Sequence, residues 1–202
     1  MSVRTAIDRF RFRGAFSPPA VASRQGDFCS KATGSCTIAA VSGGAMALTL
    51  ASTSEVENAC LYMGDILPYD IDDLIRLEII AKVSGTLSAN TSLAFGLAGA
   101  RNDAIDSIAQ AALFRAIGNN TIVLETDDGT NEVDDGGADG AVISTSYKRF
   151  VIDFATGIKT QSAPSLSLGG KSNILFYVGN ANGSLRQVGR NTSHSMAAYT
   201  GN

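Results

Sequence analysis

Tryptophan is absent from this chain, and histidine, cysteine and proline are scarce. Its 202 residues include no Trp, one His, three Cys and four Pro. The lone histidine, His194, lies far in sequence from the cysteines and no CxxC pair occurs, which argues against a zinc site. Scattered cysteines in a chain of this length predict reduced thiols, buried as small apolar side chains, in a cytosolic setting. A bridge between Cys29 and Cys36 is the alternative.

Excess charge and long apolar runs are also missing. The formal net charge is −3, so bulk charge predicts neither nucleic-acid nor membrane binding. No apolar run reaches the length of about 18 residues that a transmembrane helix needs, and the N-terminus lacks the apolar core of a secretory signal peptide.

Catalytic signatures are absent as well. The chain has no G-x-S-x-G elbow, and its Gly-rich segments lack the Lys-Ser/Thr of a P-loop. Glu78 and Asp153 lie in strand-like runs, and only a coincidence of the fold would place them as the carboxylate pair of a glycosidase. We therefore expect no enzymatic activity and no cofactor.

What the chain has is strand-like patterning, most clearly over residues 113–154. Three apolar runs, LFRAI, TIVLE and KRFVIDF, are separated by Gly-Asn-Asn and by a long Asp/Gly loop. β-Branched and aromatic residues alternate in the runs, and turn formers fill the gaps. Together with the 21 glycines, this predicts an all-β fold, an antiparallel jelly-roll β-sandwich.

Further strands are predicted at 36–41, 46–51, 58–63, 71–83, 92–97 and 173–178. In the 71–83 run, we expect the face with Leu77 and Ile79 to point to the core, and Arg76 and Glu78 to lie on the wet face. Residues 103–117 fit both a helical stripe and a strand. We expect at most a short helix near 103–109 that passes into a strand.

The first 27 residues differ in charge from the rest. Five arginines oppose one aspartate within 1–24, and Ser17-Pro18-Pro19 favours an extended path. This predicts a basic N-terminal arm over 1–27, which lies on an acidic surface, and a single β-sandwich domain over 28–202. The alternative is a first strand, Ile7–Phe12, with solvated arginines. The candidate interaction residues are Arg4, Arg9, Phe10, Arg11, Phe12 and Arg13.

Seven carboxylates crowd residues 125–139 with no basic residue among them. Hard cations prefer several oxygen ligands, which makes Asp127, Asp128, Asp134 and Asp135 weak calcium candidates, although the spacing does not fit an EF-hand. A second interpretation is a solvated turn whose Asp side chains cap backbone amides. A third is that this loop accepts the basic arm of a neighbouring subunit, an association that raised salt would weaken.

Three segments, LETDDGTNEVDD, YKRFVIDF and NILFYVGNANGSLRQVG, resemble the jelly-roll decoration (cement) proteins and other minor virion proteins of tailed bacteriophages. In that family, a loop of D-D-G-T type leads to a strand that ends in F-x-I-D-F, and an F-Y-V hairpin follows. The matching positions are Glu125–Glu132, Tyr147–Phe154 and Ile174–Val188. The resemblance covers the C-terminal half, and the Asn-Ala-Asn-Gly turn here is longer than the family's.

The resemblance implies a non-enzymatic protein on the outside of an icosahedral head, assembled in the host cytoplasm. Its partner would be the major capsid protein, and it would bridge capsomers as a homotrimer. The alternative is a carbohydrate-binding β-sandwich module on a virion or secreted protein, because similar hairpins occur there. Sugar platforms expose aromatic side chains, so the absence of Trp and the presence of only five Tyr weigh against this alternative.

Overall fold

In a computed structural model, the chain forms two compact units. The units are Met1–Leu67 and Pro68–Asn202. The predicted boundary after residue 27 falls inside the first unit and stays a prediction. The candidate interaction residues of the arm and His194 lie outside the described residues. The described residues are 23–25, 28–42, 45–51, 53–62, 76–99, 101–130, 132–135, 139–154 and 174–191.

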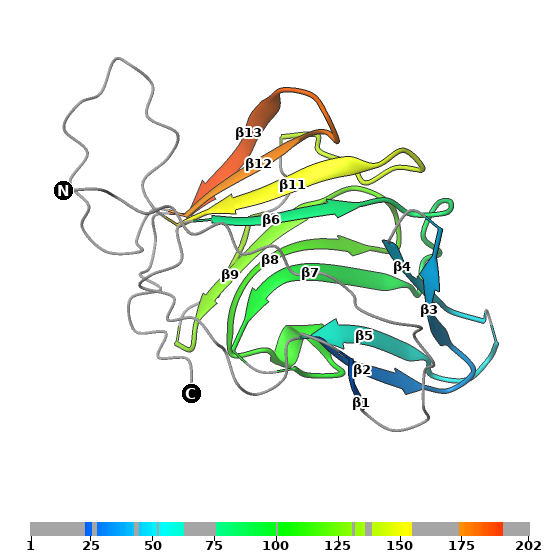
Figure 1. The fold of residues 1–202 in the computed structure, drawn as a ribbon. Helices are drawn as coiled ribbons and strands as arrows, with labels where there is room; N and C mark the ends of the chain where they lie inside the picture. Colours follow the sequence, from blue (N-terminus) through cyan, green and yellow to red (C-terminus); the bar gives the residue numbers. More distant parts are fainter. Residues whose placement is uncertain are drawn as a thin grey trace, which may run out of the picture. The chain divides into compact units, whose positions relative to one another are not determined.

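The first unit consists of two small antiparallel sheets (Figure 1). One has three strands in the order β1-β2-β5, and the other is the β3–β4 hairpin. The hairpin pairs Thr37 with Thr49 and Val41 with Ala45. The bounds are β1 Ser23–Gln25, β2 Phe28–Thr33, β3 Thr37–Val41, β4 Ala45–Thr49 and β5 Asn58–Tyr62.

The three cysteines all belong to this unit. Cys29 and Cys36 are free thiols and not bridged to each other, and of the three only Cys36 is buried as predicted, since Cys29 and Cys60 are half-buried. Cys36 is buried, and its Sγ lies 3.1 Å from the carbonyl oxygens of both Thr33 and Asn58. It therefore behaves as a small buried side chain with a weak donor, which is the ordinary role of a free cysteine.

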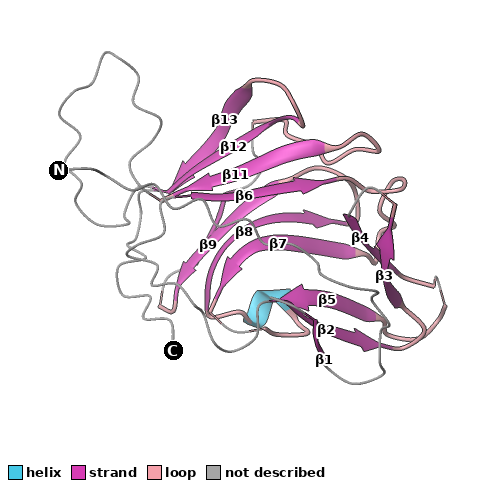
Figure 2. Cartoon of the chain, viewed as in Figure 1, coloured by secondary structure: helices cyan, strands magenta, loops and turns pink. Residues whose placement is uncertain are grey.

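The second unit holds two four-stranded antiparallel sheets (Figure 2). We name the sheet with the order β10-β9-β8-β7 sheet I, and the sheet with the order β13-β12-β11-β6 sheet II. Sheet I contains β7 Ser92–Ala98, β8 Gln110–Ile117, β9 Val123–Asp128 and β10 Glu132–Asp135. Sheet II contains β6 Arg76–Ala81, β11 Lys148–Asp153, β12 Ile174–Asn180 and β13 Leu185–Asn191.

An aromatic cluster joins the facing sides of the two sheets. Phe114 of β8 is fully buried, and its ring centroid lies 5.6 Å from that of Phe95 on β7. Across the core, it lies 5.2 Å from both Phe150 on β11 and Phe176 on β12, in edge-to-face geometry. Such pairs add to the free energy gained from apolar burial alone. The all-β fold with packed antiparallel sheets, predicted from the alternating runs, is confirmed.

In strand β6, alternating polar and apolar side chains determine which face of the strand points to the core. Leu77 and Ile79 are partly buried, whereas Arg76 and Glu78 are exposed. Ile79 lies opposite Phe150 of β11, on the core side. The predicted orientation of this strand is therefore correct.

The ambiguous segment before β8 contains one short turn of 3-10 helix, Ile105–Ser107. The side chain of Asn102 supports it, since its Oδ1 accepts from the Ala104 amide (3.0 Å) and its Nδ2 donates to the Ser107 carbonyl (3.1 Å). The chain then enters β8 at Gln110. The expectation of at most a short helix near 103–109 that passes into a strand is confirmed.

The jelly-roll connection itself is not confirmed. Strands β7 to β10 are neighbours in both sequence and space, and so are β11 to β13. A jelly roll is built from two Greek keys, in which a long connection returns a strand beside an earlier one. Here β11 returns beside β6 after the strands of sheet I, but the order of sheet I shows no such return. Among the described residues, no helix is long and apolar enough to cross a bilayer.

Candidate functional site

The acidic segment folds as the β9–β10 hairpin. Its two strands place Asp127 directly opposite Glu132. At the tip, the Asp127 carboxylate accepts a hydrogen bond from the Gly129 amide (2.7 Å), and that of Asp128 accepts one from the Thr130 amide (2.9 Å). These are Asx turns, in which a short acidic side chain replaces a backbone acceptor. The geometry therefore agrees with the interpretation of a turn whose aspartates cap backbone amides.

Metal binding at this hairpin stays a prediction. Among the side chains that the structure describes, no group of three or more His, Cys, Asp or Glu could hold a metal ion. The side chains of Asp134 and Asp135 are not among them. Asp139, the last carboxylate of the segment, accepts a hydrogen bond from Arg186 of β13 at 2.8 Å. That ion pair is exposed and contributes little to stability.

A buried arginine neutralises the start of the acidic segment. Because Phe114 points into the core, its neighbour Arg115 emerges on the outer face of sheet I. There its guanidinium donates hydrogen bonds to both Glu125 of β9 and Asp106 of the 3-10 turn. The side chains of Arg115 and Glu125 are 5% and 1% exposed, whereas that of Asp106 is 78% exposed. One cation thus ties β8 to β9 and to the turn that precedes β8.

The pKa of Arg115 reflects this arrangement. Desolvation by burial lowers it, but the hydrogen bonds to Glu125 and Asp106 outweigh that effect, and the net shift is upward. The guanidinium is therefore charged at every accessible pH. Sequence reasoning missed this partnership, because Arg115 lies outside the acidic segment and meets Glu125 only as a diagonal neighbour across two strands.

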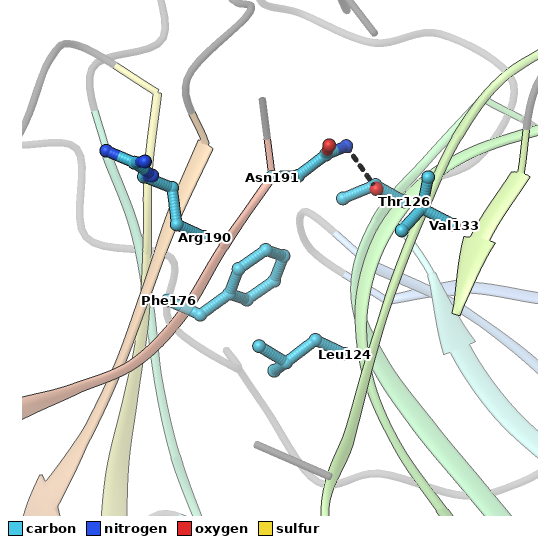
Figure 3. A pocket seen from close by; sticks show the side chains of 6 residues that line it. All are labelled: Leu124, Thr126, Val133, Phe176, Arg190 and Asn191. Carbon is cyan, nitrogen blue, oxygen red and sulfur yellow. Dashed lines mark hydrogen bonds between the residues drawn. The ribbon is translucent and has the colours of Figure 1, made fainter. Parts of the chain in front are cut away.

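A small cavity opens between the sheets at the rim formed by β10 and β13 (Figure 3). Its volume is about 10 Å³, which leaves room for at most about one water molecule. At its edge, the Asn191 side chain donates a hydrogen bond to the hydroxyl of Thr126 (Figure 3). Pockets for organic ligands usually measure about 300 Å³ or more. This cavity is a packing feature and not a substrate site. Its lining is Leu124, Thr126, Val133, Phe176, Arg190 and Asn191.

Sheet II carries a cluster of apolar side chains in the middle of its outer face, in addition to those on its core face. Val151 and Tyr177 stand opposite each other there, and Leu175 lies on the same face. All three are buried, and Leu185 packs against them. In most antiparallel sandwiches, the outer face is solvated and polar. Here the middle of sheet II is packed on both faces, so apolar burial outside the sandwich core also stabilises this sheet.

The carboxylates considered for glycosidase chemistry share this outer face. Asp153 lies opposite Arg76, and Glu78 lies opposite Val151, so the two are diagonal neighbours. Glu78 is flanked by Arg149 at 3.1 Å and by Arg76 at 3.7 Å. Two arginines therefore hold Glu78 in ion pairs on the surface of the sheet, and the expectation that Glu78 and Asp153 are not a catalytic pair stays a prediction.

Comparisons with known proteins add no relative: no protein-family model matches the chain, and neither a curated protein nor a solved structure is found to be similar to it.

Proposed function

We propose that this chain is a structural interaction protein that decorates the outside of a tailed-bacteriophage head and stabilises the shell by bridging capsomers. The proposal has two parts: interaction through surfaces, which the geometry supports, and a phage head as the setting, which the sequence motifs support. Its partner is then the major capsid protein, and the chain acts as a homo-oligomer, a trimer if it follows the family that it resembles.

The observation that carries the proposal is the position of the three resembling segments. They correspond to the β9–β10 hairpin, to β11 with the turn before it, and to the β12–β13 hairpin. These strands supply much of both sheets of the sandwich. The resemblance therefore concerns the scaffold itself and not a detached loop.

The form of the described surfaces supports interaction over catalysis. The rim cavity holds about one water molecule. Several charged groups on the faces of the sheets form ion pairs with one another, as in the Arg115–Glu125 and Arg149–Glu78 pairs. A protein that holds a symmetric shell together binds through many copies of the same weak contact. A rigid surface presents that contact in the same way in every copy.

Co-sedimentation with empty phage heads tests the proposal. The purified chain is centrifuged alone and with heads that lack decoration protein, and the bound fraction is measured against concentration. We expect saturable binding at a fixed ratio to the major capsid protein, and greater resistance of the decorated heads to heat. A chain that stays in the supernatant at all concentrations, but is retained on a polysaccharide column, would overturn the proposal in favour of the carbohydrate-binding module.

The basic arm adds a second test. If residues 1–24 dock on the acidic hairpin of a neighbouring subunit, deletion of these residues weakens association, and raised salt has the same effect on the full-length chain. The salt dependence should be lost in the deletion variant. Unchanged association after the deletion would exclude the arm as a contact and leave the rest of the proposal standing.

A further inference from the structure

The β3–β4 hairpin combines exposure with a complete lack of charge. Residues 32–54, between Lys31 and Glu55, contain no Asp, Glu, Lys, Arg or Pro. Four of the five residues of β3 are exposed, and only Ile38 is buried. Large apolar side chains are exposed as well, with Val41 at 42%, Leu48 at 44% and Leu50 at 39%. In the register of the hairpin, Leu48 lies opposite Ile38 and Val41 lies opposite Ala45, so the exposed apolar side chains lie on both faces and not in one continuous patch.

The hairpin also has open edges. It forms a two-stranded sheet, and none of the other described strands pairs with β3 or β4. A hairpin of two strands is at best marginally stable in water and gains from a third strand. Natural proteins protect exposed edges with charged side chains or proline. Three of the four edge strands of the sandwich follow this rule: β10 carries acidic residues, β6 carries Arg76 and Glu78, and β13 carries Arg186 and Arg190. The fourth, β7, carries no charge.

We propose that the open edge of β3 pairs with β3 of a second copy of this chain, antiparallel and about a two-fold axis. In such an interface the residue on the two-fold axis lies opposite its own copy, so a charge at that position would face a like charge. Strand β3, Thr-Ile-Ala-Ala-Val, meets this requirement because it has no charge to repel its copy. The pair of hairpins then forms one four-stranded sheet, in which the edge groups of both β3 strands gain backbone hydrogen bonds.

Pairing centred on Ala39, the middle residue of β3, sets Ala39 against its own copy and Thr37 against Val41 of the other. The inference does not rest on the proposed function, because it concerns the association of the purified chain. It is also compatible with a trimer held by other surfaces, since two-fold and three-fold contacts combine in assemblies of D3 symmetry.

Charge variants of Ala39 test the pairing. We expect the wild-type chain to self-associate in sedimentation-velocity experiments. Ala39→Lys and Ala39→Glu should each raise the dissociation constant about fivefold or more, because two like charges then stand opposite each other. An equimolar mixture of the two variants should recover association, since the mixed pair brings Lys against Glu. Recovery in the mixture cannot arise from a folding defect in either variant.

Ala89→Lys is the matched control, the same chemical change at an exposed loop position of the second unit. It should associate like the wild-type chain. A monomeric wild-type chain at all concentrations, or Ala39 variants that associate normally, would overturn the inference. So would variants that are monomeric alone and stay monomeric when mixed. Capsid binding is measured separately, and its failure leaves these outcomes unaffected.

Discussion

Asn191, the last residue of β13, donates its side-chain amide to the hydroxyl of Thr126 on β9, and this hydrogen bond links sheet II to sheet I. Both residues are buried, at 5% and 2% exposure. The bond lies at the rim where the edge strands of the two sheets meet, beside the small cavity of Figure 3. The bond connects the two sheets at a place where the small cavity leaves the apolar packing between them incomplete.

Replacement of Thr126 by valine keeps the shape of the side chain but removes the acceptor. The buried amide of Asn191 then loses this partner, which we expect to cost about 1–3 kcal/mol in the free energy of unfolding. Urea denaturation measures the change. The matched control is Thr121→Val, at an exposed position, which should change stability by less than about 0.5 kcal/mol. Equal effects of the two substitutions would show that the link between the sheets contributes nothing.

Replacement of Arg115 by methionine should have the largest effect on stability among the charged residues considered. It leaves the nearly inaccessible carboxylate of Glu125 without its cation, and breaking a buried pair in this way costs about 3–5 kcal/mol. The double variant Arg115→Met/Glu125→Met removes both charges, so it should be clearly more stable than the single variant. Chemical denaturation of the three proteins gives the comparison.

Arg101→Met is the control for this prediction. Arg101 pairs with Asp103 a few residues away, but the side chains are 22% and 51% exposed. An exposed pair is worth about 0–1 kcal/mol, so this variant should stay close to the wild-type chain. If Arg115→Met is no more destabilised than Arg101→Met, the buried pair does not hold β8, β9 and the 3-10 turn together.

The parts of the fold that followed from the sequence depend on local patterns. The two faces of β6 could be assigned because a strand presents alternate residues to opposite sides, and Leu77 and Glu78 differ strongly in polarity. The strand after the 3-10 turn was expected from its end. Gly118 and the two asparagines after it are turn residues that terminate β8, whether or not the segment before β8 is helical. Gly118 indeed has a positive φ of 66°.

The parts that escaped prediction depend on register and on distant partners. Arg115 reaches Glu125 only once β8 and β9 are aligned residue by residue. Asn120 was expected simply as a turn residue. Its side chain, however, accepts from the Leu87 amide at 2.9 Å and donates to the Gly85 carbonyl at 3.2 Å, more than 30 residues away in sequence. No periodicity within one strand encodes such contacts, so they appear only in the folded chain.

Gly96 lies in β7 where this strand closely approaches β8, so we expect that the position does not tolerate a larger side chain. Its φ of +153° is one that other residues rarely adopt, and a Cβ there would lie 2.3 Å from the Ala112 carbonyl oxygen of β8. Gly96→Ala should therefore push β7 from β8 and lower the melting temperature by several degrees, at about 2–4 °C per kcal/mol for a chain of this length. Gly85→Ala is the control, because nothing lies within 4 Å of its Cβ position. A Gly96→Ala variant as stable as this control would contradict the close approach.

Glu55 provides a prediction about pH in the first unit. Its carboxylate accepts hydrogen bonds from the Ser35 hydroxyl and, at 3.0 Å, from the Ser35 amide, 20 residues earlier in the chain. The hydroxyl bond is the main cause that lowers the pKa of Glu55 below its ordinary value of 4.5, although desolvation opposes it. A carboxyl group whose pKa is lower in the folded chain stabilises the fold above its unfolded pKa, and that contribution is lost as the pH falls through the folded value.

Titration of the Glu55 side-chain carbon by NMR measures this directly. We expect a midpoint below 4.5 in the wild-type chain and a higher midpoint in Ser35→Ala, which loses the hydroxyl bond but keeps the bond from the amide of residue 35. Thr53→Ala, which removes the smallest of the contributing hydrogen bonds, should shift it much less. A wild-type midpoint at or above 4.5, or one that Ser35→Ala leaves in place, would show that Ser35 and Glu55 do not hold the turn before β3 against the segment that leads to β5.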